Sequence, residues 1–421
     1  MRLQSRILVA CAGIIAASVT LRGAQAPPQK PGLTPPPPAP SDLRVRVDRV
    51  GVMPTHINPT SPVVAGDQLL LVDQAGTLSR WDGHAATTLL TPKSLPPGVR
   101  LLGGESLINV AADRAGTHVY AVFVSSLVPK GVKRLMSPRD PDGWYVLVQY
   151  QFDGQTLTSP RPIVALQMRS EGHTGGGLVV ADDDLVLFAV GDNGDSYEDG
   201  RGHGQDAQTH LAKIMRITPS DGAVSVAALG VRAAQRLAIG TWAGERWLTF
   251  VDPGGWISEE VNGARLTDFS SSASLDFGWG RHPVDGKARE GTYDIDRLGN
   301  SAAQLPDDEP GFVQPIAQVG RATGERIAVS GPVPGGPSFS RITLLFGDLV
   351  SGRVFATTGP MTARRQAVLE VGVVDAEGKD TTLKALAGNA RPDPRFFTFP
   401  DGTAGVLLEK TGEFFRVTEL R

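Results

Sequence analysis

A histidine followed by three nearby glycines is the first candidate for chemistry in this sequence. His173 stands in the stretch EGHTGGGLVVADDDLVLFAVGDNGD (171–195), where the glycines open a predicted strand. Glycines at a strand entry let a ligand or another backbone approach closely, and a histidine there can act as a general base near neutral pH. The alternative is a loop histidine that caps a turn, and spacing alone favours it.

The end of the same stretch is rich in oxygen ligands. These side chains suit Ca²⁺ by type: Asp192, Asn193, Asp195, Asp199 and Asp206. Their spacing does not fit an EF-hand loop, so solvated turn residues are the alternative. His203 and His210 lie seven residues apart near these acids and suggest zinc, but no helical i, i+4 spacing supports such a site.

A second candidate segment, GVRAAQRLAIGTWAGERWLTFVDPGGWISEEVN, covers residues 230–262. Arg232 and Arg236 precede a predicted pair of strands, and a Pro-Gly-Gly-Trp loop follows them. The main-chain carbonyls of this loop, together with Glu259 and Glu260, are suited to a hard cation. The alternative is a connecting turn that binds nothing.

Composition and motif content exclude several classes of function. Lys+Arg 41 and Asp+Glu 44 give a formal net charge of −3, so the chain lacks the positive field that nucleic-acid binding needs. Hydrophobic residues make up 41% of the chain, which argues against wholesale disorder. No G-x-S-x-G elbow, P-loop, HExxH or Rossmann fingerprint occurs in the right context.

The first 26 residues are predicted to be an export signal (1–26). Arg2 and Arg6 form a positive n-region, residues 7–20 are apolar, and Ala-Gln-Ala precedes the predicted cleavage point. Pro27 is a poor context for cleavage, so an uncleaved anchor is the alternative, although the apolar run is shorter than the ~20 residues that span a bilayer. We therefore expect a secreted or periplasmic protein with no further membrane span.

A proline-rich linker is predicted to follow over residues 27–40 (PPQKPGLTPPPPAP). Such a composition favours semi-rigid polyproline II structure. The single cysteine, Cys11, lies in the predicted signal, so the mature chain would have no disulfide and no cysteine metal site. Residues 41–421 are predicted to form one folded domain.

Short apolar runs separated by Gly and Asp predict an all-β domain. A strand–turn–strand pattern recurs six times, with turns near Asp67, Gly116, Asp183, Gly244, Gly352 and Gly402. Six such units predict a six-bladed β-propeller of four-stranded antiparallel blades, because each blade needs its neighbours to cover its two faces. The alternative is a pair of β-sandwiches, but no linker composition occurs near the midpoint of the chain.

Long, polar, glycine-rich insertions are where a propeller carries function, because its ligands bind to loops at one end of the ring. Three segments qualify: residues 191–210, 251–293 and 303–316. Two of them contain some of the candidate residues described above, although His173 and Arg232 lie outside all three.

Six stretches, taken in order, match the motifs of one known family. HTGGGLVV…LVLFAVGDNGD resembles H-x-G-G-R-L…L-Y-x-T-I-G-D, LAKIMRITPSDG resembles G-K-V-L-R-L-x-x-D-G, and VRAAQRLAI resembles R-N-P-Q-G-L-A. EEVN with DFGWG is similar to D-E-I-N with N-Y-G-W-P, and residues 106–124 and 391–417 add two further matches. The chain resembles the soluble PQQ-dependent glucose/sorbosone dehydrogenases, which include the aldose sugar dehydrogenases, over most of residues 48–419. That family is a six-bladed propeller, in agreement with the repeats.

The resemblance implies a redox mechanism. In that family a histidine takes the proton of the sugar's anomeric hydroxyl while hydride passes to PQQ, Ca²⁺ polarises the quinone, and arginines hold its carboxylates. The resemblance places His173 on the base, Asp192 on the aspartate near the sugar, and Arg232 on the arginine beside the quinone.

The resemblance also implies where the cofactors bind. The backbone carbonyls of Gly254 and Gly255 fall on the Ca²⁺ ligands. Arg391 and Arg395 lie one residue out of register with the arginine pair that grips PQQ, and we expect them to bind this cofactor.

Several positions depart from the family pattern. Ala233 stands where the family has asparagine, Val350 where it has lysine, and Gly177 where it has arginine. Pro253 and Gly255 replace the glutamine and proline around the calcium carbonyls, and the arginine pair that grips PQQ falls on Pro392 and Pro394. Since each charge-assisted hydrogen bond contributes about 1.5–3 kcal/mol, these losses weaken binding of a trianionic cofactor.

Two main hypotheses follow. The first is a secreted PQQ-dependent sugar dehydrogenase-like oxidoreductase that passes electrons on to an external acceptor. The alternative is a non-catalytic propeller that has lost the PQQ site and binds carbohydrate or a protein partner. A metal-assisted lactonase stays open as a third hypothesis, because four acids lie in the candidate segments: Asp192, Asp195, Glu259 and Glu260.

Overall fold

The structure is a computed structural model. It describes residues 34–55, 57–103, 106–136, 143–169, 172–194, 203–255, 257–281, 288–295, 301–306, 309–321, 327–334, 336–362 and 364–420. The predicted signal and residues 27–33 lie outside the described residues. Within the described residues, no helix is both long enough and apolar enough to cross a membrane. The helical elements are short: η2 (His203–Gln205), α1 (Leu266–Ser270) and α2 (Leu383–Leu386).

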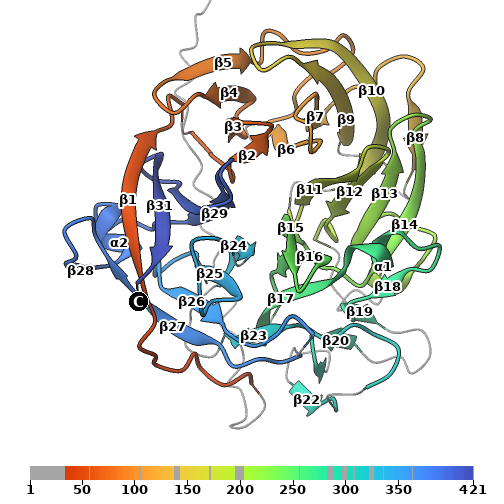
Figure 1. Ribbon diagram of the computed structural model, residues 1–421. Helices are drawn as coiled ribbons and strands as arrows, with labels where there is room; N and C mark the ends of the chain where they lie inside the picture. The colour runs from red at the N-terminus through yellow and green to blue at the C-terminus, as the bar shows by residue number, and fades with distance from the viewer. Residues whose placement is uncertain are drawn as a thin grey trace, which may run out of the picture.

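β-Sheets arranged in a ring around a common centre make up most of the protein, which confirms the all-β prediction (Figure 1). The first sheet runs from the centre outward as β2 (Val63–Ala65), β3 (Gln68–Asp73), β4 (Thr77–Trp81) and β5 (Ala86–Leu90). The second contains β6 (Leu107–Ala112), β7 (His118–Ser125), β9 (Gly143–Phe152), β10 (Leu157–Met168) and the parallel edge strand β8 (Lys133–Leu135).

The third and fourth sheets carry most of the candidate residues at their ends. The third contains β11 (Gly175–Asp182), β12 (Leu185–Val190), β13 (Lys213–Thr218), β14 (Ala223–Leu229) and the parallel edge strand β18 (Leu275–Asp276). The fourth contains β15 (Gln235–Trp242), β16 (Glu245–Asp252), β17 (Ser258–Arg265) and β23 (Ala317–Gly320).

A small additional sheet is inserted in the chain between β17 and β23. It contains β19 (Gly280–Arg281), β20 (Ala288–Glu290), β21 (Tyr293–Ile295) and β22 (Ser301–Gln304). It lies at the periphery of the ring (Figure 1). This insertion accounts for the wide gap between the predicted turns at Gly244 and Gly352.

The last sheet has nine strands and joins the two ends of the chain. Its order is β24 (Ile327–Pro334), β25 (Leu344–Asp348), β26 (Val354–Thr357), β27 (Leu369–Val374), β1 (Arg44–Val52), β31 (Glu413–Glu419), β30 (Ala404–Leu408) and β29 (Pro394–Thr398), with β28 (Asp380–Thr381) paired to β27. The N-terminal strand β1 pairs antiparallel with β31 and parallel with β27. The ring is therefore closed by strands from both ends of the chain.

All six predicted turns join two antiparallel strands. Five of them lie between the innermost strand of a sheet and the next strand, and the turns near Asp67 and Gly116 are two examples. The turn near Gly352 instead joins β25 to β26, which are the second and third strands of their part of the nine-stranded sheet.

The apolar core lies between neighbouring sheets. Leu70 of the first sheet packs in one cluster with Val110 of the second, and Val122 of the second packs in another with Phe188 of the third. All four side chains are fully buried. Each sheet is thus covered by its neighbours, as expected for blades that cannot bury both faces alone.

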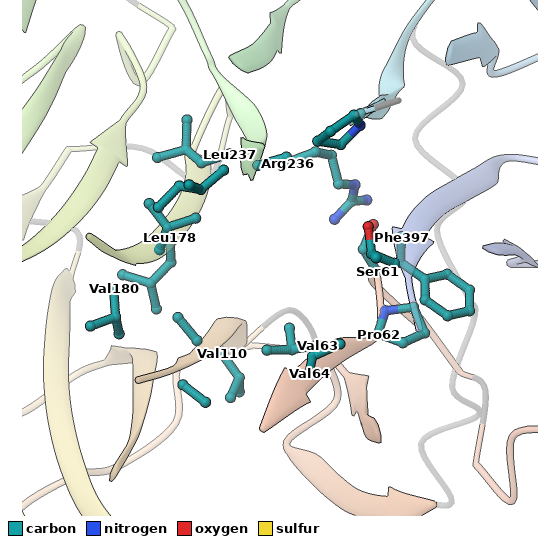
Figure 2. A pocket seen from close by; sticks show the side chains of 18 of the residues that line it. Ser61, Pro62, Val63, Val64, Val110, Leu178, Val180, Arg236, Leu237 and Phe397 are labelled. Carbon is teal, nitrogen blue, oxygen red and sulfur yellow. The ribbon is translucent and has the colours of Figure 1, made fainter. Parts of the chain in front are cut away.

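A cavity of about 500 Å³ lies at the centre of the ring (Figure 2). Aliphatic and aromatic side chains of the innermost strands line most of it, among them Val63, Val110 and Leu237. Arg236 lies at its wall, where its guanidinium bonds the Thr60 hydroxyl. Arg236 also lines a second, more polar cavity of about 270 Å³, so this side chain stands between the two.

Part of the predicted linker lies against the ring. Pro35 and Pro38 are buried, and Ala39 forms a parallel bridge with Leu369. The carbonyl oxygen of Pro35 is 2.9 Å from the point that a Cβ at Gly320 would occupy. The described residues of this segment are therefore packed on the folded domain.

Candidate functional site

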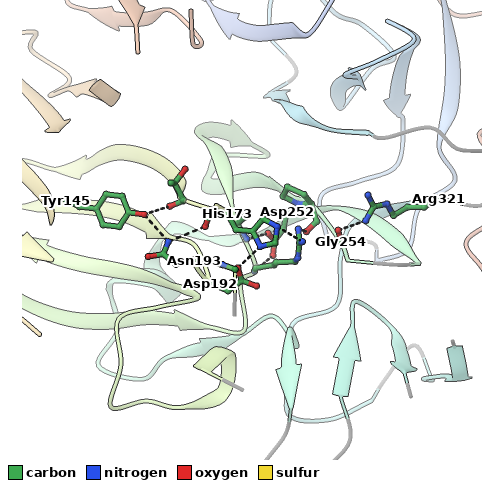
Figure 3. A network of polar contacts seen from close by, with 12 residues as sticks. Tyr145, His173, Asp192, Asn193, Asp252, Gly254 and Arg321 are labelled. Atoms are coloured by element: carbon green, nitrogen blue, oxygen red, sulfur yellow. Dashed lines mark hydrogen bonds and ion pairs between the residues drawn. The ribbon is translucent and has the colours of Figure 1, made fainter. Parts of the chain in front are cut away.

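His173 and Asp192 come together because they flank one hairpin. His173 precedes β11, Asp192 follows β12, and Gly175 pairs with Val190 at the open end of this hairpin. His173 Nδ1 lies 2.8 Å from Asp192 Oδ1 (Figure 3). The His173 side chain is 41% exposed, whereas that of Asp192 is 2% exposed. A solvent-accessible imidazole is thus held by a buried carboxylate, a contact that was not predicted from the sequence.

Arg232 contacts the other ring nitrogen. Its Nη2 lies 2.9 Å from His173 Nε2. A guanidinium can only donate, so Nε2 accepts this hydrogen bond and the proton of the neutral ring sits on Nδ1, which donates to Asp192. This tautomer leaves the lone pair of Nε2 directed away from Asp192, as a general base requires.

Local backbone geometry positions the imidazole. His173 has φ 48°, in the left-handed region that non-glycine residues rarely adopt. Gly191 permits this arrangement, since a Cβ there would lie 1.7 Å from the His173 carbonyl oxygen. Asn193 Nδ2 donates to Tyr145 Oη at 3.0 Å, and Tyr145 Oη lies 3.4 Å from the Thr174 carbonyl oxygen (Figure 3). These buried contacts hold the loop in place.

Three groups hold Arg232 beside the histidine. Asp252 Oδ2 accepts its backbone N–H at 2.7 Å, while Asp252 Oδ1 accepts that of Ala233 at the same distance. Arg232 Nη1 donates to the Pro253 carbonyl at 3.1 Å, and the guanidinium stacks 5.3 Å from the ring centre of Trp279. Burial raises the pKa of Asp252 to about 7.

The carbonyls expected to bind Ca²⁺ bind an arginine instead. Arg321 Nη1 donates to the Gly254 carbonyl at 2.6 Å (Figure 3). It also donates to the Gly255 carbonyl. Arg321 Nε lies 2.9 Å from Glu259 Oε1, and its backbone N–H donates to the Ile257 carbonyl at 3.0 Å. The position predicted for a cation therefore carries the charge of the protein's own guanidinium.

Glu290 of the small additional sheet braces the same loop. Its Oε1 accepts the N–H groups of Ile257 at 2.7 Å and Ser258 at 2.8 Å. It is fully buried, and a Cβ at Gly254 would lie 2.4 Å from this oxygen. The small additional sheet thus contacts the loop that presents the carbonyls.

Glu259 and Glu260 are buried rather than arranged around a metal. Burial raises the pKa of Glu259 to about 8, although Arg321 and Arg232 both lower it. Burial also raises the pKa of Glu260 well above its ordinary value, and Glu260 accepts a hydrogen bond from Asn262 at 3.0 Å. Among the described residues, no three or more His, Cys, Asp or Glu side chains form a group that could hold a metal ion.

The other predicted metal ligands have different partners or lie elsewhere. His210, which is 3% exposed, places Nε2 2.7 Å from the Gln167 carbonyl oxygen, and burial lowers its pKa. His203 lies in η2, and Asp206 accepts a backbone N–H two residues further on at 2.9 Å. Two of the acids lie outside the described residues: Asp195 and Asp199.

Arg391 and Arg395 line the polar cavity beside the histidine loop, but both are paired with acids. This cavity is bordered by residues 174–176, directly after His173. Arg391 lies 3.2 Å from Asp393. Arg395, which is 5% exposed, forms ion pairs with Asp393 and, at 2.7 Å, with Glu409. Ion pairs within the protein therefore offset much of the positive charge of these two arginines.

Several residues of the site were not identified as candidates from the sequence. Tyr145 and Arg321 lie outside the candidate segments, whereas Asp252 and Glu290 lie within the segments 230–262 and 251–293 but belong to no motif that indicated contact. Trp279 is the exception, because it belongs to the DFGWG stretch that matched a family motif. Its contact with Arg232 gives that match a structural meaning.

Comparison with known proteins bears on the family. Residues 58–250 match the family model for glucose/sorbosone dehydrogenase. The predicted family resemblance is confirmed. A comparison with curated protein sequences finds no significant match.

Solved structures of sugar dehydrogenases share the fold. The PQQ-bound aldose sugar dehydrogenase from Streptomyces coelicolor is 18% identical, with a TM-score of 0.59 over 91% of this chain and 100% of that chain. The apo aldose sugar dehydrogenase from Escherichia coli is 17% identical, with a TM-score of 0.57 over 89% and 99%. A putative glucose dehydrogenase from Thermus thermophilus is 17% identical, with a TM-score of 0.56 over 90% and 100%.

The cofactors of the glucose/sorbosone dehydrogenases fit this chain unequally. The polar cavity has three arginines, Arg236, Arg391 and Arg395, against Asp393 and Glu409. Burial and a hydrogen bond with Asp393 raise the pKa of Glu409 to about 8, while burial and the charge of Arg395 lower the pKa of Arg236. This set suits the carboxylates of PQQ. Ca²⁺ does not fit at the carbonyl pair, because a guanidinium is bound there.

Proposed function

We propose that this protein is a sugar dehydrogenase-like oxidoreductase in which His173 is the general base. The observation that carries the proposal is the Asp192–His173–Arg232 arrangement, with distances of 2.8 and 2.9 Å at the two ring nitrogens. The family match and the shared fold favour a sugar as the substrate.

The proposed reaction divides the work among three side chains. The lone pair of His173 Nε2 takes the proton of a sugar hydroxyl, and Asp192 stabilises the imidazolium that forms. Arg232, which contacts Nε2 before substrate binds, can turn its N–H groups to the substrate oxygen as negative charge develops there. The carbon that bears this oxygen loses a hydride, so an aldose becomes a lactone.

PQQ, when bound, supplies the two-electron acceptor for the hydride. Arg391 is the residue of the polar cavity best placed to hold one of its carboxylates, because its side chain is 57% exposed and its ion pair with Asp393 is at 3.2 Å. Arg395 and Arg236 add positive charge from deeper in the wall. Ca²⁺ has no part in the proposal, since Arg321 binds the carbonyls.

The proposal includes a six-bladed propeller and an exported protein. The nine-stranded sheet divides into one blade of β24–β27 and another of β29–β31 with β1, which together with the first four sheets gives six. The predicted signal over residues 1–26 favours secretion or a periplasmic location, where an external acceptor would take the electrons.

Titration of the apo-protein with PQQ, followed by absorbance and thermal stability, tests the cofactor. A dye-reduction assay with aldoses then tests the base. His173→Ala and Asp192→Asn should each lower the rate by about 10²–10⁴-fold, the usual contribution of general base catalysis. Unchanged rates in His173→Ala would contradict the proposal.

His118 offers a matched control for His173. It is also 41% exposed, and its Nδ1 lies 2.9 Å from Asp113, but it stands on β7 away from the candidate site. His118→Ala removes the same kind of His–Asp contact and should leave PQQ binding and dye reduction unchanged. An equal loss in both histidine variants would indicate a general effect on folding.

A non-catalytic carbohydrate-binding propeller is the second candidate. The pairing of Arg391 and Arg395 with Asp393 and Glu409 favours it, because charge used within the protein is less available to a cofactor. Saturable sugar binding together with no PQQ binding at high concentration would support this candidate over the first.

A further inference from the structure

Arg321 is built into the site rather than placed there by a flexible side chain alone. It directly follows β23, whose Gly320 pairs with Ser258, and its own N–H continues this ladder to the Ile257 carbonyl at 3.0 Å. The side chain is 15% exposed. Sheet pairing therefore fixes the point from which the guanidinium reaches Gly254 and Gly255.

The guanidinium satisfies the acceptors that a metal ion would need. Nη1 binds the carbonyls of Gly254, at 2.6 Å, and Gly255, while Nε binds Glu259 at 2.9 Å. Ca²⁺ requires six to eight oxygen ligands, and it would have to displace this cation first. Displacement would also leave Glu259, whose side chain is 3% exposed, without its ion-pair partner.

A second guanidinium binds the same loop. Arg232 Nη1 donates to the Pro253 carbonyl at 3.1 Å while Nη2 reaches His173. Two arginines therefore bind three consecutive carbonyls, residues 253–255, at the edge of the site. Within the described residues Arg321 Nη2 makes no hydrogen bond, which leaves it as a donor for an oxygen atom of a ligand.

We propose that Arg321 is the resident cation of this site, and that its guanidinium, rather than a divalent metal ion, supplies the positive charge beside Gly254 and Gly255. The site then binds the oxygen atoms of its ligand through hydrogen bonds from two arginines and needs no calcium. A fixed guanidinium differs from a metal ion in being insensitive to chelators and in offering directed donors.

The test uses cation binding alone. Tb³⁺, a luminescent substitute for Ca²⁺, is titrated into the full chain with excitation of tryptophan, because the Trp279 ring lies 3.1 Å from the point that a Cβ at Gly255 would occupy. Thermal unfolding with Ca²⁺ and with EDTA is measured in parallel. The wild-type protein should show no saturable sensitised luminescence and no change in Tm with either reagent.

Removing the guanidinium should open the carbonyl pair to a metal. Arg321→Ala should gain saturable Tb³⁺ luminescence and a Ca²⁺-dependent rise in Tm, with Kd in the range of about 10⁻⁴–10⁻³ M typical of extracellular calcium sites. Arg321→Gln is the second neutral variant in case the alanine variant does not fold. Arg321→Lys, which retains a cation, should gain nothing.

Two outcomes would overturn the inference. Saturable, Tm-raising Ca²⁺ binding by the wild-type protein would mean that the metal displaces Arg321. Folded neutral variants that gain no metal binding would mean that the carbonyl pair is not a cation position.

Arg353→Ala, which breaks the ion pair with Glu370 in the nine-stranded sheet, is the control for loss of an arginine. The inference concerns the same site as the proposed function, but no sugar or PQQ enters the test, so the two can fail separately.

Discussion

Substitution of Glu290 tests whether the small additional sheet shapes the candidate site. Both hydrogen bonds from the loop, those of Ile257 and Ser258, end on the same atom, Oε1. Glu290→Ala leaves two buried N–H groups without an acceptor, and each costs about 1–3 kcal/mol. We therefore expect the free energy of unfolding to fall by about 2–6 kcal/mol.

Glu290→Gln separates hydrogen bonding from charge. A glutamine oxygen at the same place can still accept both N–H groups, so only the charge assistance is lost. Since hydrogen bonds to charged groups are roughly twice as strong as neutral ones, we expect this variant to lose about 1–2 kcal/mol. The expected order of stability is therefore wild type, glutamine variant, alanine variant.

Urea unfolding followed by tryptophan fluorescence gives the free energy of global unfolding. Hydrogen exchange at the amides of Ile257 and Ser258 gives the local stability of the loop. Every 1.4 kcal/mol of local stability lost should lower amide protection about tenfold. Glu370→Ala is the control, because its ion pair with Arg353 is partly exposed and contributes about 1 kcal/mol or less. Wild-type stability and amide protection in Glu290→Ala would refute the bracing role.

Three further predictions concern pH, backbone fit and the arginine stack. Because the pKa of Glu409 is raised from 4.5 to about 8, the folded state keeps a proton that the unfolded chain releases. The free energy of unfolding should fall by up to about 1.4 kcal/mol per pH unit as the pH rises from 4.5 to about 8. The urea midpoint of Glu409→Gln should change less with pH than that of the wild type. Gly254→Ala would place Cβ 1.6 Å from a backbone carbonyl oxygen, so we expect a loss of at least about 3 kcal/mol, and a wild-type thermal melt would contradict this. Trp279→Leu removes the stack on Arg232, worth about 0.5–2 kcal/mol, and should lower kcat/KM for an aldose about 2–30-fold with an unchanged circular dichroism spectrum.

Local patterns carried most of the fold prediction. The turns near Asp67, Asp183 and Gly402 were recognisable because a hairpin needs only a few adjacent residues of the right type. Ring closure was not recognisable, because the pairing of β1 with β31 and β27 joins segments more than three hundred residues apart in sequence. Nothing in β1 itself marks it as the partner of the last strands.

In the candidate site, too, residues in short motifs could be predicted from the sequence, and the others could not. His173, Asp192 and Arg232 were identified through short motifs, and the structure brings them together. Arg321 was not identified, because an arginine that binds carbonyls inside a protein has the same local sequence signature as one in solvent. We expected Ca²⁺ at the carbonyls of Gly254 and Gly255 and did not predict this arginine, because only the three-dimensional structure shows which donor contacts the carbonyls.

Pairing of the first strand with the last ones has a kinetic consequence. The ring stays open until the chain beyond Glu413 has been made, so β1 cannot take its final place while the protein is being synthesised. After closure, unfolding that starts at the N-terminus must separate β1 from two partner strands, β27 and β31. Loss of a few residues from the start of β1 should therefore shorten the lifetime of the folded protein far more than an equal loss from a surface loop.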